Sequence, residues 1–206
     1  MKRRGILFVL SSPSGAGKST MAKMLLAAED DIRVSVSATT RPARPGEAHG
    51  REYFFESEEN FDRLVLDNAL IEWAHVFDHR YGTPRGPVEQ ALAAGEDMLF
   101  DVDWQGTQQL KQQMREEIVS IFLLPPSMAE LERRLRGRGT DSDAVIQGRM
   151  DRAAAEISHW AEYDYVFVND DLKTCFSAVQ KVVDGERLKR SRRGASLTDF
   201  VRNLTG

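Results

Sequence analysis

The sequence predicts an α/β fold in which a parallel sheet, flanked by helices, carries a smaller inserted subdomain. Short apolar runs alternate with amphipathic helical stretches along most of the 206 residues. Such alternation predicts parallel strands joined by right-handed helical crossovers. Between residues 51 and 84 aromatic and turn residues become more frequent, and we expect a mostly antiparallel subdomain to be inserted there.

The first strand is expected at residues 6–10, because a continuous apolar run is typical of a strand buried on both faces. A helical pattern follows over residues 18–28, and a short strand fits residues 33–37. In the inserted region, candidate strands lie at residues 53–55, at residues 71–77 and around Tyr81, with a helix near residues 58–68.

The alternation of helices and strands then resumes. Strands are expected at residues 98–102, 118–124 and 165–168, and helices at residues 88–94, 107–114, 128–136, 142–163 and 172–184. Gly95 is a good C-cap for the first of these helices, and Ser127 can cap the helix that follows two prolines. Thr140, with Asp143 three residues later, predicts the start of the long helix.

The composition indicates one globular domain and excludes several classes of protein. Apolar residues make up 41% of the chain and charged residues 29%, which argues against disorder. The formal net charge is −4, so we expect no nucleic-acid partner. No apolar run approaches the ~18 residues that span a membrane, and the single Cys175 cannot form an intrachain disulfide. We therefore expect a cytoplasmic protein without a membrane partner.

A phosphate-binding loop follows the first expected strand. Its residues are Ser12, Pro13, Ser14, Gly15, Ala16, Gly17, Lys18, Ser19 and Thr20. They match the P-loop pattern G-x-x-x-x-G-K-[ST], although Ser12 replaces the first glycine. Backbone N–H groups of residues 14 to 19 can still point inward, and the start of the next helix favours anions. We expect Lys18 to bridge the β- and γ-phosphates of a nucleotide and Ser19 to ligate Mg²⁺.

Two carboxylates, Asp101 and Asp103, come at the end of another expected strand. Ligands of open α/β sheets bind at the carboxyl ends of the strands. Alternation along a strand would place both carboxylates on one face. We expect them to lie beside the phosphate loop, near its metal ion.

The arginines narrow the choice of reaction. Arg41 and Arg44 lie at a strand end, in a loop stiffened by proline and glycine. Arg138 lies in a turn between two glycines, and Arg149 lies on the following helix. Arginine binds phosphate through a planar pair of donors, and this layout is typical of a mobile lid over a transferring phosphoryl group. We expect a nucleoside monophosphate kinase; a GTPase would need an Asn-Lys-x-Asp element, and Asn169-Asp170-Asp171 lacks the lysine.

The chain resembles the bacterial guanylate kinases, a family of P-loop nucleoside monophosphate kinases, over about residues 5–185. The matching motifs lie at residues 11–20, 35–47, 50–55, 71–73, 81–83, 101–106, 138–141 and 168–171. The resemblance implies transfer of the γ-phosphate of ATP to GMP, giving ADP and GDP, with Mg²⁺. It also implies a core of about residues 1–36, 86–136 and 160–190, a GMP-binding insertion at 37–85, a helical lid at 137–159 and a basic tail at 186–206.

The resemblance further implies roles for single residues. Guanine would be read by Ser37, Glu72 and Thr83, and the GMP phosphate would be bound by Arg41, Arg44, Tyr53 and Tyr81. Asp101 and Asp103, in the motif that ends at Gly106, would order GMP and the water shell of the metal, with Ser19 and Asp101 nearest the ion. Phosphoryl transfer would depend on Lys18, Arg44, Arg138 and Arg149. Asn169 and Asp170 would lie against the adenine of ATP.

Glu72 also has a direct physical reason to select guanine. Guanine offers two adjacent donors, N1–H and the 2-amino group, and one carboxylate can accept both. Adenine presents an acceptor at N1, which would face the lone pairs of Glu72 and leave a buried carboxylate unpaired.

The sequence leaves two alternative functions and the role of the C-terminal segment undecided. A binding module of the same fold would take phosphorylated peptides, but such modules typically have degraded phosphate loops, and Gly17, Lys18 and Ser19 are intact here. A kinase for another small phosphorylated substrate is disfavoured by Glu72. For the basic segment 189–194 and a short amphipathic helix at 196–203, the net-acidic chain favours a solvated tail or a docked helix over a nucleic-acid contact, and a contact in a homo-oligomer stays open.

Overall fold

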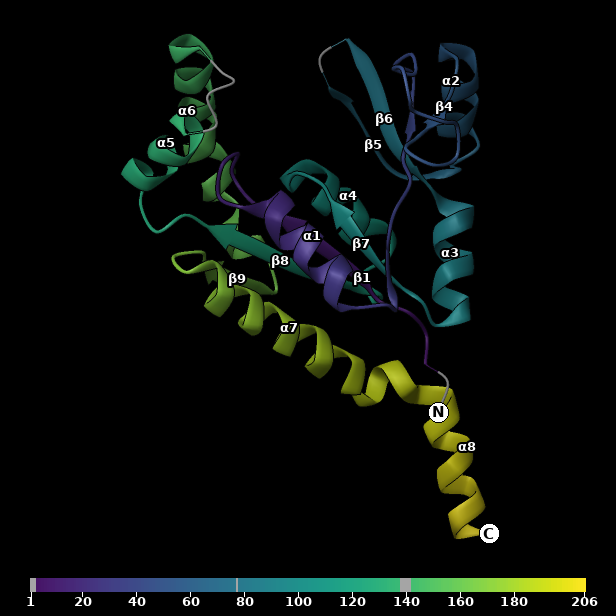
Figure 1. Ribbon diagram of the computed structural model, residues 1–206. Coiled ribbons are helices and arrows are strands. Elements are labelled where there is room, and N and C mark those ends of the chain that lie inside the picture. Colours follow the sequence, from purple (N-terminus) through teal and green to yellow (C-terminus); the bar gives the residue numbers. More distant parts are fainter. Residues whose placement is uncertain (1–2, 77, 138–141) are drawn as a thin grey trace.

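The strands of the computed structural model, which describes residues 3–76, 78–137 and 142–206, form two sheets (Figure 1). The larger sheet contains, in spatial order, β2 (Ile32–Val34), β7 (Asp97–Asp101), β1 (Leu7–Ser11), β8 (Ile118–Leu124) and β9 (Tyr165–Val168). Every neighbouring pair in it is parallel. The prediction of a parallel core sheet is confirmed.

The smaller sheet lies in the inserted region. Its order is β4 (Phe54–Phe55), β3 (Ala38–Thr39), β6 (His79–Pro84) and β5 (Leu70–Val76). The pairs of β6 with β3 and β5 are antiparallel, and β3 pairs with β4 in parallel. The insertion is therefore mostly antiparallel, as expected. Strand β3 was not predicted, because two residues are too few to leave a periodic pattern.

Helices flank both sheets. They are α1 (Lys18–Ala28), α2 (Glu58–Leu66), α3 (Arg85–Ala94), α4 (Trp104–Gln113), α5 (Met128–Arg136), α6 (Asp143–Ser158), α7 (Leu172–Leu188) and α8 (Gly194–Thr205), with 3₁₀ turns η1 (Trp160–Glu162) and η2 (Arg190–Arg193). None of them, within the described residues, has both the length and the apolar character to cross a bilayer.

Helix α6 begins where the sequence predicts and ends earlier than predicted. Its N-cap is Ser142, whose hydroxyl accepts a hydrogen bond from Val145 N; Thr140 lies outside the described residues. The helix ends at Ser158 because the chain tightens into η1 before β9, whereas the sequence pattern predicted continuation to Tyr163. Ser127 caps α5 as predicted, and Gly95 ends α3 with a φ of 88°.

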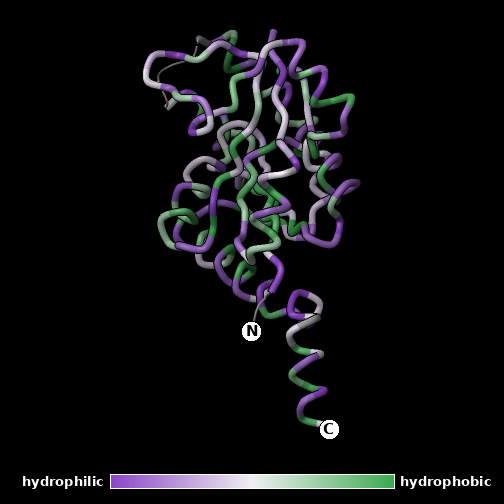
Figure 2. The backbone as a smooth tube through the Cα atoms, turned by 90° about the vertical axis from the view of Figure 1, so that its right-hand side faces the viewer, coloured by the Kyte–Doolittle hydropathy of each residue, from purple (hydrophilic) through white to green (hydrophobic). Residues whose placement is uncertain are grey.

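Strand β1 is buried on both faces, so its side chains belong to two hydrophobic clusters, one on each face of the sheet. Phe8 packs with α1 and α7, while Leu7 and Val9 pack with α3 and α4. The apolar residues concentrate inside the sheet layer in the tube view (Figure 2). Two lobes, α5–α6 and the smaller sheet with α2, stand above the carboxyl edge of the large sheet (Figure 1).

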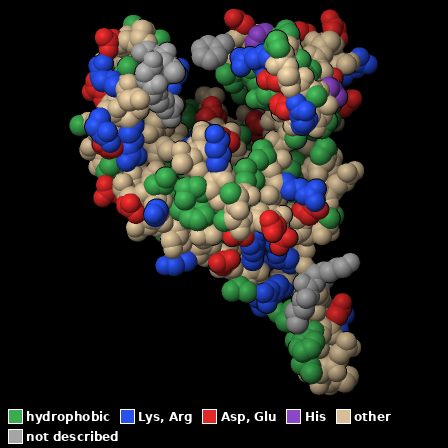
Figure 3. Space-filling view, in the orientation of Figure 1, with side chains coloured by type: hydrophobic (Ala, Val, Ile, Leu, Met, Phe, Trp, Pro, Cys, Tyr) green, Lys and Arg blue, Asp and Glu red, His purple; other side chains and the backbone are tan. Residues whose placement is uncertain are grey.

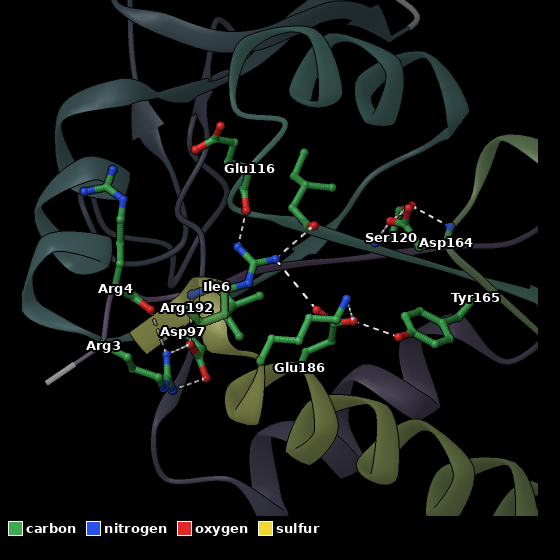
Figure 4. A network of polar contacts seen from close by, with 12 residues as sticks. Arg3, Arg4, Ile6, Asp97, Glu116, Ser120, Asp164, Tyr165, Glu186 and Arg192 are labelled. Atoms are coloured by element: carbon green, nitrogen blue, oxygen red, sulfur yellow. Dashed lines mark hydrogen bonds and ion pairs between the residues drawn. The ribbon is translucent and has the colours of Figure 1, made fainter. Parts of the chain in front are cut away.

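Ion pairs hold the amino-terminal ends of the strands in the large sheet (Figure 4). Asp97, fully buried at the start of β7, accepts hydrogen bonds from both terminal nitrogens of Arg3, at 2.6 and 2.7 Å, and from Ile6 N. Arg187 of α7 donates to the same carboxylate at 2.8 Å and also pairs with Glu29 at the end of α1. The network connects the chain start, β7, α1 and α7.

Part of the basic tail folds back on these strand ends. The Arg192 guanidinium donates to the carbonyl oxygens of Glu116 and Ile118, beside buried Glu186 (Figure 4). Beyond η2, helix α8 extends away from the body (Figures 1 and 2). Its Phe200 and Leu204 are 48% and 69% exposed. Within the described residues the tail is thus anchored at η2, and the outer part of α8, from Thr198 onward, is exposed.

Candidate active site

Two glycines shape the loop between β1 and α1. Gly15 has a φ of 99° and Gly17 a φ of 103°, a region that disfavours any residue with a Cβ. A Cβ on Gly17 would also collide with the Asn169 side chain. Among the described residues no side chain caps α1, so its first N–H groups are left for a ligand. This is the geometry of an anion-binding cradle.

The loop packs against helices α5 and α6, and it is hydrogen-bonded to the residue that follows β9. Ala16 is buried in an apolar cluster with Leu131 and Leu135 of α5 and Ile146 of α6. Asn169, at the end of β9 and 3% exposed, donates from Nδ2 to Ala16 O at 2.8 Å. Asn169 therefore buttresses the loop, and the adjacent Asp170 is exposed. Of the other loop residues, Pro13 is buried, Ser12, Ser14 and Lys18 are partly exposed, and Ser19 and Thr20 are exposed.

Lys18 lies across the loop from an acidic strand end. Its Nζ is 2.5 Å from Oδ1 of Asp101, the last residue of β7. Asp103 is not in the strand, contrary to the alternation expected for the two carboxylates. It is the N-cap of α4, and its Oδ1 accepts from Gly106 N at 2.9 Å. The two carboxylates nevertheless reach the same cavity, because the chain turns into the helix between them.

That cavity, of about 260 Å³, lies between the two sheets. Its lining includes Ser37, Tyr53, Glu72, Tyr81, Asp101 and Asp103. In the space-filling view the molecule is hollowed between the two lobes, with acidic side chains at the bottom of the hollow (Figure 3). Residues that are far apart in the sequence thus come together at one place.

Glu72 contributes a buried carboxylate to this cavity. It is 7% exposed, and Oε1 accepts a 2.6 Å hydrogen bond from Thr83 Oγ1. The register of β5 against β6 shifts between Leu70 and Trp73, and such irregularities re-aim side chains near functional sites. Burial raises the pKa of Glu72, the Thr83 hydrogen bond opposes this, and the charge of Asp103 adds to it. Gly106 packs closely on the start of this turn, since a Cβ on it would lie 3.1 Å from Val102 Cβ, and only in ordinary contact, at 3.5 Å, with Glu72 Oε2.

Gln109, which the sequence patterns did not single out, connects this strand to the core. Its side-chain amide accepts from Trp73 N and donates to Trp73 O, each at 3.0 Å. From helix α4, Gln109 thus forms hydrogen bonds with both the backbone N–H and the backbone C=O of Trp73, the residue after Glu72. Only the three-dimensional pairing of β5 with α4 reveals this role, because a glutamine on a helix carries no motif.

Arg41 lies in a cluster of aromatic rings at the other side of the cavity. Its guanidinium pairs with Glu47 at 2.9 Å and is 5.3 Å from the centre of the Tyr53 ring. The Tyr53 and Tyr81 rings meet edge to face at 5.9 Å. Glu47 raises the pKa of Arg41, and Arg41 lowers that of Glu47. Arg44 is exposed on the same loop and donates its backbone N–H to Glu47.

Helix α6 contacts the phosphate loop through two side chains of opposite charge. Arg149 donates to Ser14 Oγ at 3.1 Å, and Ser14 N donates to Oε2 of Glu156 at 3.3 Å. Glu156 was not among the residues predicted from the sequence. Its spacing of seven residues from Arg149, which returns to the same helix face, is the signal that could have found it. Arg138 lies outside the described residues.

A magnesium site has suitable donors here. No group of three or more His, Cys, Asp or Glu side chains is gathered as a metal site within residues 3–76, 78–137 and 142–206. Mg²⁺ in kinases is usually bound through one or two protein oxygens, waters and the substrate phosphates. The hydroxyl of Ser19 and the carboxylate of Asp101, beside Lys18, are oxygen donors of that kind.

Known proteins resemble the chain along its whole length. A family model described as guanylate kinase matches residues 4–186. A guanylate kinase of Bradyrhizobium diazoefficiens is 57% identical over 100% of this chain and 94% of the relative. One of Sphingopyxis alaskensis is 59% identical over 99% and 92%. The crystal structure of guanylate kinase from Anaplasma phagocytophilum has 41% identity and a TM-score of 0.72, covering 93% of this chain and 90% of that one. On this likeness the chain belongs to the guanylate kinase family.

Proposed function

We propose that this protein transfers the γ-phosphate of ATP to GMP, giving ADP and GDP, at the carboxyl edge of the large sheet. One observation carries the proposal. The cavity that contains buried Glu72 also contains Asp101, and the Asp101 carboxylate is 2.5 Å from Lys18 of the phosphate loop. A site for a base and a site for a polyphosphate are therefore adjacent. An oxygen of the GMP phosphate attacks the γ-phosphorus of ATP, and the bond to the leaving ADP oxygen breaks.

GMP would occupy the cavity between the sheets. Glu72 accepts from guanine N1–H and the 2-amino group, with Ser37 and Thr83 as further polar contacts. Arg41, Tyr53 and Tyr81 form the phosphate end of the site, joined by the exposed Arg44. Glu47 and the Tyr53 ring hold the Arg41 guanidinium at this end of the site, where its remaining N–H groups would bind the phosphate.

ATP would bind with its phosphates on loop residues 12–20. Lys18 neutralises charge between the phosphates, and Arg44, Arg138 and Arg149 stabilise charge on the transferring group. Ser19, and Asp101 through water, would hold Mg²⁺. When bound, that ion neutralises charge on the phosphate oxygens. Asn169, which donates to Ala16 O of the loop, and the adjacent Asp170 would lie against the adenine.

We also propose a homo-oligomer in the cytoplasm. The substrates are cytoplasmic nucleotides, and the exposed apolar side chains of α8, among them Phe200, Val201 and Leu204, support self-association. Light scattering by the full chain in solution measures the mass directly. A monomer across the micromolar range would remove the oligomer from this proposal.

A panel of phosphate acceptors tests the function. ADP release from ATP is measured with GMP, AMP, CMP and UMP as acceptors. We expect kcat/KM for GMP to exceed that for AMP by at least about 10⁴, because a site built to hydrogen-bond the substrate rejects an analogue that leaves buried groups unpaired. Turnover with another monophosphate instead would identify a different kinase. Binding without turnover of any acceptor would identify a binding module.

A further inference from the structure

Helix α6 presents opposite charges to a single residue of the phosphate loop. Arg149 and Glu156 are two helical turns apart and face the same side. The guanidinium of Arg149 donates to the hydroxyl of Ser14, and the backbone N–H of Ser14 donates to the Glu156 carboxylate. An arginine beside a phosphate-binding loop can neutralise the charge of a bound phosphate. A carboxylate hydrogen-bonded to an amide of the same loop cannot, and its presence there needs another explanation.

The surroundings of Glu156 are those of an anion inside an anion-binding site. The side chain is half-buried at the mouth of the loop. Burial raises the pKa of Glu156, while the Ser14 N–H and the charges of Lys18 and Arg152 oppose that shift, and Asp103 adds to it. The carboxylate thus shares Lys18 and a loop amide with the phosphates that the loop is built to bind.

We propose that Glu156 is an internal occupant of the phosphate loop, which competes with the phosphates of ATP for Ser14 N–H and is displaced when ATP binds. The inference rests on the proposed binding of ATP to this loop. One N–H cannot serve both anions, and a carboxylate near a phosphate is repelled. Arg149, which contacts Ser14 Oγ already, carries the opposite charge and is not repelled, so ATP binding breaks only the Glu156 contact of α6 with the loop. Glu156 is a positioning residue that couples the lid helix to the state of the loop.

The variant Glu156→Gln separates charge from shape. The amide oxygen still accepts from Ser14 N, but the negative charge is gone. We expect the Kd for ATP, measured by calorimetry, to fall about fivefold or more, since a nearby like charge is removed. GMP affinity should stay within about twofold, because the phosphate end of its site, at Arg41 and Tyr53, is formed by the insertion and not by α6.

A matched control is Asp151→Asn on the same helix. Asp151 is exposed and accepts a hydrogen bond from Gln147, so this variant changes the net charge equally without touching the loop. Its Kd for ATP should equal that of the wild type. Thermal melts add a second readout. The rise in Tm on adding ATP should be larger for Glu156→Gln than for the wild type or Asp151→Asn, because the empty loop no longer has its internal anion.

The outcomes distinguish the two proposals. If Lys18→Ala binds ATP as tightly as the wild type, the assignment of ATP to the loop is wrong. If Lys18→Ala weakens ATP binding while Glu156→Gln binds ATP as the wild type does, or more weakly, the competition by Glu156 is overturned and the assignment of the loop stands. An equal gain in Asp151→Asn would also overturn it, because the effect would then be one of net charge.

Discussion

The ionised carboxylate of Glu72 is unfavourable for folding, while the proposed recognition of guanine requires it. The carboxylate is nearly fully buried with a hydrogen bond from Thr83, and burial raises its pKa. Because the folded-state pKa is above the unfolded one, ionised Glu72 destabilises the fold, and this cost disappears as pH falls through the raised pKa. Guanine binding has the reverse requirement, since only the ionised carboxylate accepts from both donors.

Glu72→Gln should therefore impair catalysis without harming the fold. The amide oxygen can still accept from Thr83, and no charge remains buried. Opposite guanine, its N–H₂ group faces a donor, so we expect kcat/KM for GMP to fall by about ten- to a hundredfold or more. The Tm should stay constant or rise. Steady-state kinetics with GMP and AMP, together with a thermal melt, measure both effects. An unchanged GMP/AMP preference would remove Glu72 from base recognition.

The raised pKa of Glu72 also predicts a pH dependence. The kcat/KM for GMP of the wild type should decline as pH falls through that raised pKa, because protonation removes one acceptor. The ratio of wild type to Glu72→Gln should then shrink toward acidic pH. Using this ratio cancels the titration of the GMP phosphate, which both proteins share. A ratio that is constant with pH contradicts the ionised form of Glu72 as the guanine ligand.

Lys18 is expected to have a large effect on phosphoryl transfer and a small one on the fold. Its side chain pairs with Asp101 at the loop and belongs to none of the buried clusters. Lys18→Ala should abolish phosphoryl transfer, because charge between the phosphates is no longer neutralised, while circular dichroism and the Tm stay close to those of the wild type. Near-normal turnover would mean that the loop does not bind the reacting phosphates.

At the scale of an element, α6 delivers charge to the loop. In the present structure Arg149 contacts Ser14, and in the reaction it would approach the transferring phosphoryl. A charge that acts only in the transition state lowers kcat with little change in KM. Arg149→Ala should reduce kcat by roughly 10³–10⁵, as measured with both substrates saturating. A large rise in the KM for GMP at unchanged kcat would instead make Arg149 a ground-state ligand.

Elements bounded by strong local signals were predicted with their observed ends. Helix α1 follows the loop glycines, α5 lies between Ser127 and Gly137, and β8 stops at a pair of prolines. Strand β3 and the end of α6 were missed because tertiary pairing and packing decide them. In the candidate site, the sequence motifs named residues that the fold brings to one cavity, such as Glu72 and Asp101, and their roles stay predictions. Gln109 and Glu156 could not be predicted, since their contacts depend on how α4 and α6 meet other elements.

At the scale of the whole molecule, the two ends of the strands in the large sheet are surrounded by different groups. Strand β7 begins at Asp97, in the buried ion network, and ends at Asp101, beside Lys18. At Asp97 the network joins the chain start, α1 and α7, and at Asp101 lies the proposed site of the reaction. Changes at the two ends of this one strand should therefore affect different properties.

Asp97→Asn tests this separation. The amide can still accept from Ile6 N, but it cannot pair with both Arg3 and Arg187, whose side chains are 16% and 17% exposed. Breaking a buried pair by removing one partner costs about 3–5 kcal/mol of unfolding free energy, measurable by denaturant titration.

The matched control is Asp143→Asn. The Asp143 carboxylate is 87% exposed and pairs with Arg136 at the surface, and such pairs contribute ~1 kcal/mol or less. Well below the Tm, kcat/KM for GMP should be unchanged in both variants, because Asp97 is four residues of strand away from Asp101. Equal stability of the two variants would show that the network is not what holds the amino-terminal strand ends, and a selective loss of kcat/KM in Asp97→Asn would show that the two ends are coupled through β7.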